Sequence, residues 1–132
     1  MKKFWEFWKK DGEHLEYFDS GQISHRTNYK DGKLHGKWIS YNRDGTIYVE
    51  TNYKDGEYDG KWTLYYKNGK IKEQQNYKDG IWDGEWIEYY ENGQIKFKHT
   101  NINGGLNGYG IEYYKNGQIE REGNYKNGKQ DG

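Results

Sequence analysis

The side chains best suited to binding a metal ion are the four histidines, His14, His25, His35 and His99. Structural zinc sites use Cys or His ligands in closely spaced pairs. These histidines lie far apart, at different positions of the repeat described below, and the chain has no cysteine. The spacing therefore predicts scattered surface histidines, no metal site and no cofactor.

Asp-Gly pairs recur at a spacing that could also supply oxygen ligands. Asp55-Gly56 is followed by Asp59-Gly60, and Asp79-Gly80 by Asp83-Gly84. A calcium loop needs several converging oxygens, typically with a bidentate Glu. Asp before Gly is also typical of tight turns. We interpret these pairs as turns.

No group of residues in the chain forms a recognisable catalytic set. Acidic side chains occur throughout the chain, and no pair is placed as an acid–base mechanism would require. The chain also lacks a nucleophile motif, a phosphate-binding loop and a cofactor motif. We predict that it is not an enzyme.

The charge balance and the lack of apolar runs narrow the range of partners. Basic and acidic residues number 21 each, whereas nucleic-acid-binding proteins usually carry a basic excess. Glu6, Lys9 and Lys10 interrupt the apolar residues near the N-terminus, where a signal peptide needs an unbroken apolar run. We expect a cytoplasmic protein with no nucleic-acid partner and no membrane association.

Glycine, isoleucine, tyrosine and tryptophan recur every 24 residues. The series are Gly21, Gly45, Gly69, Gly93 and Gly117; Ile23, Ile47, Ile71, Ile95 and Ile119; Tyr17, Tyr41, Tyr65, Tyr89 and Tyr113; and Trp38, Trp62 and Trp86. A period of this length is typical of stacked repeats. We assign five repeats, to residues 14–37, 38–61, 62–85, 86–109 and 110–132. Residues 1–13 are interpreted as a capping half repeat, because terminal repeats must cover an exposed stack.

Each repeat is predicted to form a β-hairpin. Asn68-Gly69 separates two segments rich in aromatic and β-branched residues, and Asn-Gly favours a two-residue type I′ turn. That turn predicts three opposed pairs: Tyr66 with Ile71, Leu64 with Glu73 and Trp62 with Gln75. The fold class is therefore all-β, an elongated, twisted single antiparallel sheet of about five tandem hairpins.

Alternation along the strands predicts two different faces. One face takes Trp62, Leu64, Tyr66, Ile71 and Tyr77, and the other takes Thr63, Tyr65, Lys67, Lys72 and Gln74. We predict a structural spine of Trp38, Trp62, Trp86, Ile47, Ile71 and Ile95, with Gly45, Gly69 and Gly93 in the turns. We predict a partner-binding surface on the opposite face from the tryptophans, made of Tyr41, Tyr65, Tyr89, Tyr113, Tyr48, Lys72 and Lys96, with Glu120 varying along it.

The motifs Y-Y-x-N-G-x-I, N-Y-K-D-G and D-G-K/E-W resemble the bacterial variant of the MORN repeat over nearly the whole chain. The resemblance implies a sheet of successive hairpins that binds partners without catalysis. Bacterial chains of this type are often labelled antitoxin or immunity proteins, and eukaryotic relatives are linked to membranes and scaffolding. Two departures, Thr100–Gly104 in place of NYKDG and Gly110 in place of tryptophan, predict a sheet that bends or loosens near residues 100–110.

We therefore predict a module that binds a protein partner, with a toxin as one candidate. Two alternatives remain open. Aromatic hairpin repeats also occur in choline- and glucan-binding domains, which makes the chain a candidate cell-wall or carbohydrate binder. It is also a candidate scaffold, because exposed edge strands can pair with a second copy.

Overall fold

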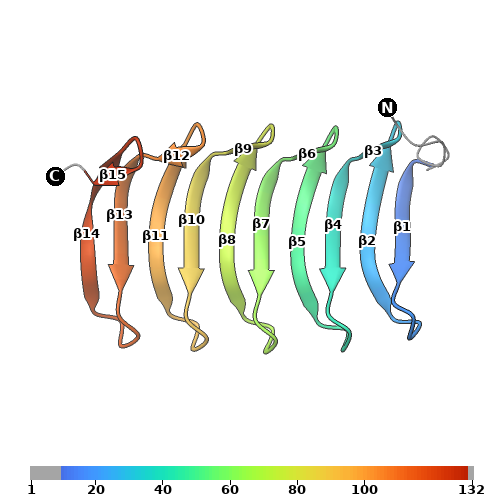
Figure 1. Ribbon diagram of the computed structural model, residues 1–132, viewed down its shortest axis with the longest axis horizontal. Coiled ribbons are helices and arrows are strands. Elements are labelled where there is room, and N and C mark those ends of the chain that lie inside the picture. The colour runs from blue at the N-terminus through green and yellow to red at the C-terminus, as the bar shows by residue number, and fades with distance from the viewer. Residues whose placement is uncertain (1–9, 131–132) are drawn as a thin grey trace.

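The computed structural model describes residues 10–130, and all of its regular structure is β (Figure 1). Its strands form three length classes. The six-residue strands are β1 (Gly12–Tyr17), β4 (Gly36–Tyr41), β7 (Gly60–Tyr65), β10 (Gly84–Tyr89) and β13 (Gly108–Tyr113). The eight-residue strands are β2 (Ile23–Lys30), β5 (Ile47–Lys54), β8 (Ile71–Lys78), β11 (Ile95–Ile102) and β14 (Ile119–Lys126). The two-residue strands are β3 (Lys33–Leu34), β6 (Glu57–Tyr58), β9 (Ile81–Trp82), β12 (Gly105–Leu106) and β15 (Lys129–Gln130).

These strands form one open antiparallel sheet, in which neighbours along the chain are also neighbours in space. Each six-residue strand pairs with the long strand that follows it, and each long strand also pairs with the six-residue strand of the next hairpin. Figure 1 shows the resulting row of hairpins, with β1 at one end and β14 at the other. The predicted fold class is confirmed. The proposed cap over residues 1–13 lies mostly outside the described residues.

The Asn-Gly turns do not have the predicted type I′ geometry. In the hairpin of β7 and β8, Gly69 N donates to Tyr66 O (3.0 Å) and Tyr66 N donates to Lys70 O (2.8 Å), which makes a three-residue loop. Gly69 has a φ of 86°, whereas Asn68 is not among the positive-φ residues. The side chain of Asn68 accepts a hydrogen bond from Lys70 N (2.9 Å). This geometry is a type I turn followed by a glycine bulge.

The type I′ turns lie at the opposite end of each hairpin, in the Asp-Gly or Asn-Gly of the NYKDG-type block. Lys54 pairs with Glu57 around a two-residue loop. Both loop residues have positive φ, 50° at Asp55 and 86° at Gly56. Asp and Asn tolerate this region better than other side chains, which explains the composition of the block.

Each long strand also carries an extra residue near the three-residue loop. Leu64 pairs with Glu73 and Tyr65 with Ile71, so that Lys72 is the bulged residue. The predicted pairs Leu64–Glu73 and Trp62–Gln75 are therefore confirmed, and the pair of Tyr66 with Ile71 is wrong. The prediction assumed a two-residue loop. The three-residue loop shifts the register by one residue, and the bulge at Lys72 restores it for the pairs farther from the turn.

The bulge changes which face several side chains occupy. Lys72 Nζ lies 5.6 Å from the ring centre of Tyr66, on the same face as the tryptophans. On the other face, Ile23 and Arg26 of β2 and Tyr41 of β4 line one shallow hollow. The isoleucine column therefore lies with the Tyr41 column. The assignment of Ile71 to the tryptophan side, and of Lys72 to the opposite side, was wrong.

Two faces are defined by these positions. The tryptophan face carries Trp38, Trp62, Trp86, Tyr53, Tyr58 and Tyr77. The tyrosine face carries Tyr17, Tyr41, Tyr65, Tyr89, Tyr113 and the five isoleucines Ile23, Ile47, Ile71, Ile95 and Ile119. The predicted spine therefore divides, with its tryptophans on one face and Ile47, Ile71 and Ile95 on the other.

The sheet is a single layer and has little apolar core. Within residues 10–130, the buried apolar side chains are Ile39 and Val49, each 8 % exposed. Most buried positions are small polar residues, among them Thr27, Thr51 and Thr63. Each side chain is covered mainly by its lateral neighbours in adjacent hairpins, so that stability depends on contacts between repeats.

The departures near residues 100–110 leave the strand pairing intact. Asn101 pairs with both Gly84 and Leu106, and β11 pairs with β13 as its counterparts do. The imidazole of His99 fills the space beside Gly110, since a Cβ at that glycine would lie 2.2 Å from His99 Nδ1. The expected loosening was therefore wrong, because His99 replaces the missing tryptophan.

Candidate partner-binding surface

A row of alternating tyrosine and isoleucine crosses the tyrosine face. Tyr65 pairs with Ile71, and the same pairing recurs in every described hairpin, as at Tyr41–Ile47 and Tyr89–Ile95. The four predicted partner-binding tyrosines, Tyr41, Tyr65, Tyr89 and Tyr113, all lie in this row and are half-buried. The structure thus brings them together on one open surface.

A second row on the same face alternates charged or amide side chains with aliphatic residues or, at one position, Thr63. Arg26 pairs with Leu15 on one side and Ile39 on the other, and Glu50 pairs with Ile39 and Thr63 in the same way. The polar members from one end to the other are Arg26, Glu50, Gln74, Lys98 and Glu122. We call these five residues the variable column.

Two residues of the variable column, Arg26 and Glu50, contact the tyrosine of the next hairpin. Arg26 Nε donates to Tyr41 Oη (2.9 Å). Tyr65 Oη donates to the carboxylate of Glu50 (2.5 Å). Burial, together with this carboxylate, raises the pKa of Tyr65 to about 12. Tyr41 and Tyr65 are thus oriented by neighbours of opposite charge, Arg26 and Glu50.

Sequence reasoning missed the variable column and chose a different one. Tyr48, Lys72, Lys96 and Glu120 occupy the bulge position, and the bulge turns them to the tryptophan face. The signal that could have identified the variable column is its change of charge between repeats, from Arg26 to Glu50 to Lys98, two residues beyond the bulge position. Counting from Trp62 places this column on the tyrosine face, as the prediction for Gln74 did.

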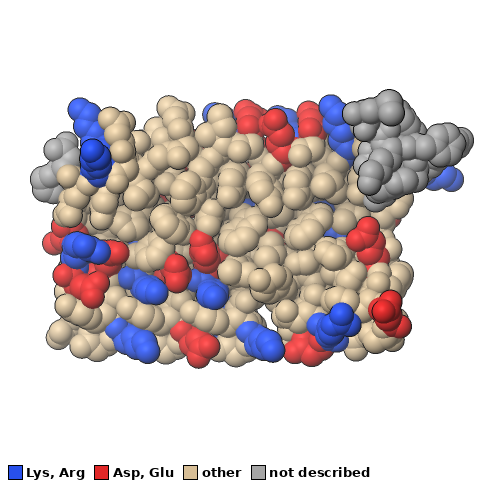
Figure 2. Space-filling model, viewed as in Figure 1, with Lys and Arg blue, Asp and Glu red and all other residues tan. Residues whose placement is uncertain are grey.

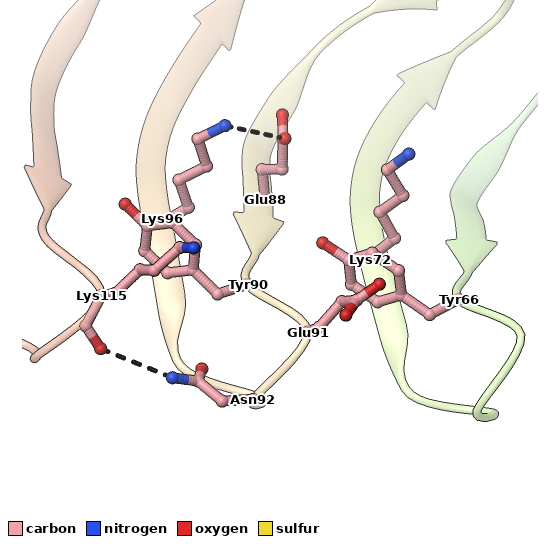
Figure 3. Close-up of a pocket in the computed structure, with 8 residues that line it drawn as sticks. All are labelled: Tyr66, Lys72, Glu88, Tyr90, Glu91, Asn92, Lys96 and Lys115. Atoms are coloured by element: carbon pink, nitrogen blue, oxygen red, sulfur yellow. Dashed lines mark hydrogen bonds and ion pairs between the residues drawn. The ribbon is translucent and has the colours of Figure 1, made fainter.

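Two of the bulge residues, Lys72 and Lys96, help to line an open groove on the tryptophan face (Figure 3). Lys72 and Lys96 lie over the rings of Tyr66 and Tyr90, at 5.6 and 5.9 Å from the ring centres. Lys96 Nζ also lies 3.5 Å from Glu88 Oε1. The groove therefore mixes charges of both signs with aromatic surface.

Aromatic rings also follow one another across the upper part of the tryptophan face. The ring centre of Tyr53 lies 6.4 Å from that of Trp38 and 5.0 Å from that of Tyr58, and the rings of Tyr58 and Tyr77 are 4.9 Å apart.

Figure 2 shows lysine, arginine, aspartate and glutamate interspersed on the face in view, without a large patch of one sign. A surface of this kind gives no strong field to attract a polyanion.

The residues first considered for metal binding have other contacts in the structure. Residues 10–130 contain no group of three or more His, Asp or Glu side chains placed to hold a metal ion. Asp59 Oδ1 accepts a hydrogen bond from Asp79 N (3.2 Å), which links successive loops. His35 Nδ1 accepts the equivalent bond from Asp55 N (3.3 Å). These side chains position the type I′ turns.

In the described part of the chain, no helix could span a membrane. No curated protein matches this chain. A solved structure of accessory secretory protein 1,2 and 3 in Streptococcus pneumoniae aligns with 17 % identity and a TM-score of 0.33, over 89 % of this chain and 20 % of that one. The MORN repeat variant profile matches five times, at residues 10–31, 34–55, 58–79, 82–100 and 106–127. The chain therefore belongs to the MORN repeat variant family.

Proposed function

We propose that this protein is a non-catalytic module whose tyrosine face binds a protein partner. The observation that carries the proposal is the combination of a constant Tyr/Ile row with the adjacent variable column. A constant row supplies contact area, and a column that differs between repeats supplies discrimination.

The chemistry of the tyrosine face suits a protein surface. Tyrosine buries a large area with few rotatable bonds and is enriched at the energetic centres of interfaces. Here Tyr41 and Tyr65 are already oriented by hydrogen bonds to Arg26 and Glu50. Ordering them on binding therefore costs little conformational entropy.

The variable column sets the charge that a partner must present. Its cations, Arg26 and Lys98, are separated by Glu50 and Gln74, and Glu122 follows. Each cation pairs with a carboxylate of its own hairpin, Glu13 at 3.1 Å and Glu85 at 3.2 Å, so a partner meets ion pairs at these two positions. A partner with charges in a complementary order is favoured, and a uniformly charged polymer is not. A toxin whose surface is masked by this face is our specific candidate.

Binding to the product of the adjacent gene tests this proposal. Titration calorimetry would compare the wild-type chain with Lys98→Glu on the tyrosine face and Lys72→Glu on the tryptophan face. We expect Lys98→Glu to weaken binding at least about tenfold, or about 1.4 kcal/mol, and Lys72→Glu to leave it unchanged. The reverse pattern would place the partner on the tryptophan face. A neighbour that is harmless when expressed alone would refute the toxin.

A cell-wall glycan is the second candidate, favoured by the run of ring contacts from Trp38 through Tyr53 and Tyr58 to Tyr77. Sugars stack on such rings. Sedimentation with purified cell wall tests it, using Tyr58→Ala on the tryptophan face and Tyr65→Ala on the tyrosine face. Loss with Tyr58→Ala alone would support glycan binding by the aromatic run, and no sedimentation of the wild-type chain would exclude it.

A further inference from the structure

The two ends of the sheet present matching halves of the contact that joins neighbouring hairpins. The five repeats of 24 residues span 120 positions, so residue n of a second copy corresponds to position n + 120 of a continued chain. By this relation, β1 of the second copy is the strand that would follow β14. We propose that the protein assembles head to tail, with β14 of one copy pairing with β1 of the next.

Tyrosine hydroxyl groups make the first recurring contact between hairpins. Tyr66 Oη donates to Tyr89 O, and Tyr90 Oη donates to Tyr113 O, both at 2.7 Å. The next member of this series is Tyr114, whose acceptor on a second copy is Tyr17 O. Tyr114 is 49 % exposed at the end of the sheet.

Asparagine side chains make the second recurring contact. Asn28 Nδ2 donates to Lys37 O (2.8 Å), and Asn76 Nδ2 donates to Glu85 O (2.9 Å). The last residue in this column is Asn124 on β14. On a second copy, its acceptor is Glu13 O. The donor is therefore present at one end of the sheet and the acceptor at the other.

Charged side chains at the two ends are complementary. Phe97 faces Glu112 across the junction of β11 and β13, and the corresponding pair between copies is Arg121 with Glu16. Within one copy Arg121 Nε already donates to Glu112 Oε2 (2.5 Å), so in the assembly Arg121 would lie between two carboxylates. Glu122 takes the place of Glu50, and Tyr17 takes that of Tyr65. Glu122 Oε2 already accepts a hydrogen bond from Tyr109 Oη, so the bond from Tyr17 Oη would be a second one to the same carboxylate. Such pairs fix the register and direction of association.

Apolar side chains at both ends remain exposed in the single chain. Tyr17 on β1 and Ile119 on β14 are 58 % and 52 % exposed, whereas Ile47, Ile71 and Ile95 in the middle of the row are half-buried. Tyr17 of a second copy would cover the last isoleucine as Tyr41 covers Ile23. β15 already pairs with the far end of β14, so the second copy joins through Glu13–Tyr17.

A head-to-tail contact does not close, and so it builds chains of increasing length. Sedimentation velocity over a concentration series of the full chain is the test. We expect the average mass to rise above 15.9 kDa with concentration and to pass the dimer without a plateau. A mass that stays at the monomer, or that stops at a dimer, would overturn the proposal.

Charge exchange tests the predicted register. Arg121→Glu opposes Glu112 of its own copy as well as Glu16 of the next, and Glu16→Arg opposes Arg121, so each variant alone should associate at least about tenfold more weakly. An equimolar mixture of the two restores an opposite-charge pair at every junction and should associate again. Lys126→Glu, on the same strand, is the control and should behave as wild type. Circular dichroism confirms that each variant is folded. A mixture that stays monomeric, or an Arg121→Glu protein that associates normally, would contradict the register.

Discussion

Gly110 provides a direct test of how the repeats pack, because the substitution that restores the repeat pattern should destabilise the protein. Three of the other repeats carry Trp38, Trp62 and Trp86 at this position, and the first carries His14. A Cβ at Gly110 would lie 2.2 Å from His99 Nδ1, 2.7 Å from His99 Cε1 and 2.9 Å from Tyr125 Cε2. All three distances are shorter than real Cβ contacts, so even Gly110→Ala must displace the imidazole.

The magnitude follows from what that displacement breaks. Overpacking a well-filled site costs about 1–3 kcal/mol. The His99 ring also contacts Phe97 at 5.2 Å and Tyr125 at 5.1 Å, and each such contact contributes about 0.5–1.5 kcal/mol. We expect Gly110→Ala to lower the free energy of unfolding by about 2–6 kcal/mol, the sum of these contributions, and Gly110→Trp to lower it further.

Urea denaturation followed by tryptophan fluorescence measures the change. The double variant His99→Thr with Gly110→Trp recreates the arrangement of Thr51 on β5 beside Trp62 on β7. We expect it to recover most of the loss. A Gly110→Ala protein as stable as wild type, or a double variant no better than Gly110→Trp, would refute the view that His99 occupies the tryptophan site.

Three further measurements test local features. Burial lowers the pKa of His99 below its unfolded value of about 6.5, so the unfolded chain binds the proton more readily and stability should be complete above about pH 6.5 and fall below it. Urea midpoints at several pH values would show this, and His99→Gln should remove the His99 part of the change. Burial is the main cause of the raised pKa of Tyr65, about 12, so Glu50→Gln should lower this pKa only part of the way towards 10, as measured by ultraviolet titration. Gly69→Ala should lower the free energy of unfolding by about 1–2 kcal/mol, because φ at Gly69 is 86°, whereas Asn68→Ala should cost less; equal losses in thermal unfolding would contradict the assigned turn.

The architecture could be predicted because it depends on spacing alone. Five repeats with glycine at constant positions allow few arrangements other than a row of hairpins, and the register over Trp62–Gln75 and Leu64–Glu73 followed from counting. The four tyrosines of the proposed surface were placed correctly for the same reason. Their alternation with Thr63 and Leu64 does not involve the loop.

The faces of the side chains between the bulge and the turn could not be predicted by counting. One extra residue in a strand reverses the face of every position between it and the turn. Ile71 and Lys72 lie in that segment, and they were assigned to the wrong faces. The variable column lies on the side of the bulge away from the turn, where counting from the tryptophans gives the correct face.

The two turns show why the dipeptide did not reveal the bulge. Asn127-Gly128 forms a type I′ turn with φ values of 54° and 79°, whereas Asn116-Gly117 has positive φ only at the glycine. The same two residues therefore adopt both geometries within one chain. What differs is the surrounding pairing: Lys126 and Lys129 are held opposite each other by the short strand β15, whereas Gln118 N bonds to Asn116 Oδ1 (2.9 Å) and supports the longer loop. Turn type in this protein is therefore set by the strands and side chains that flank the dipeptide.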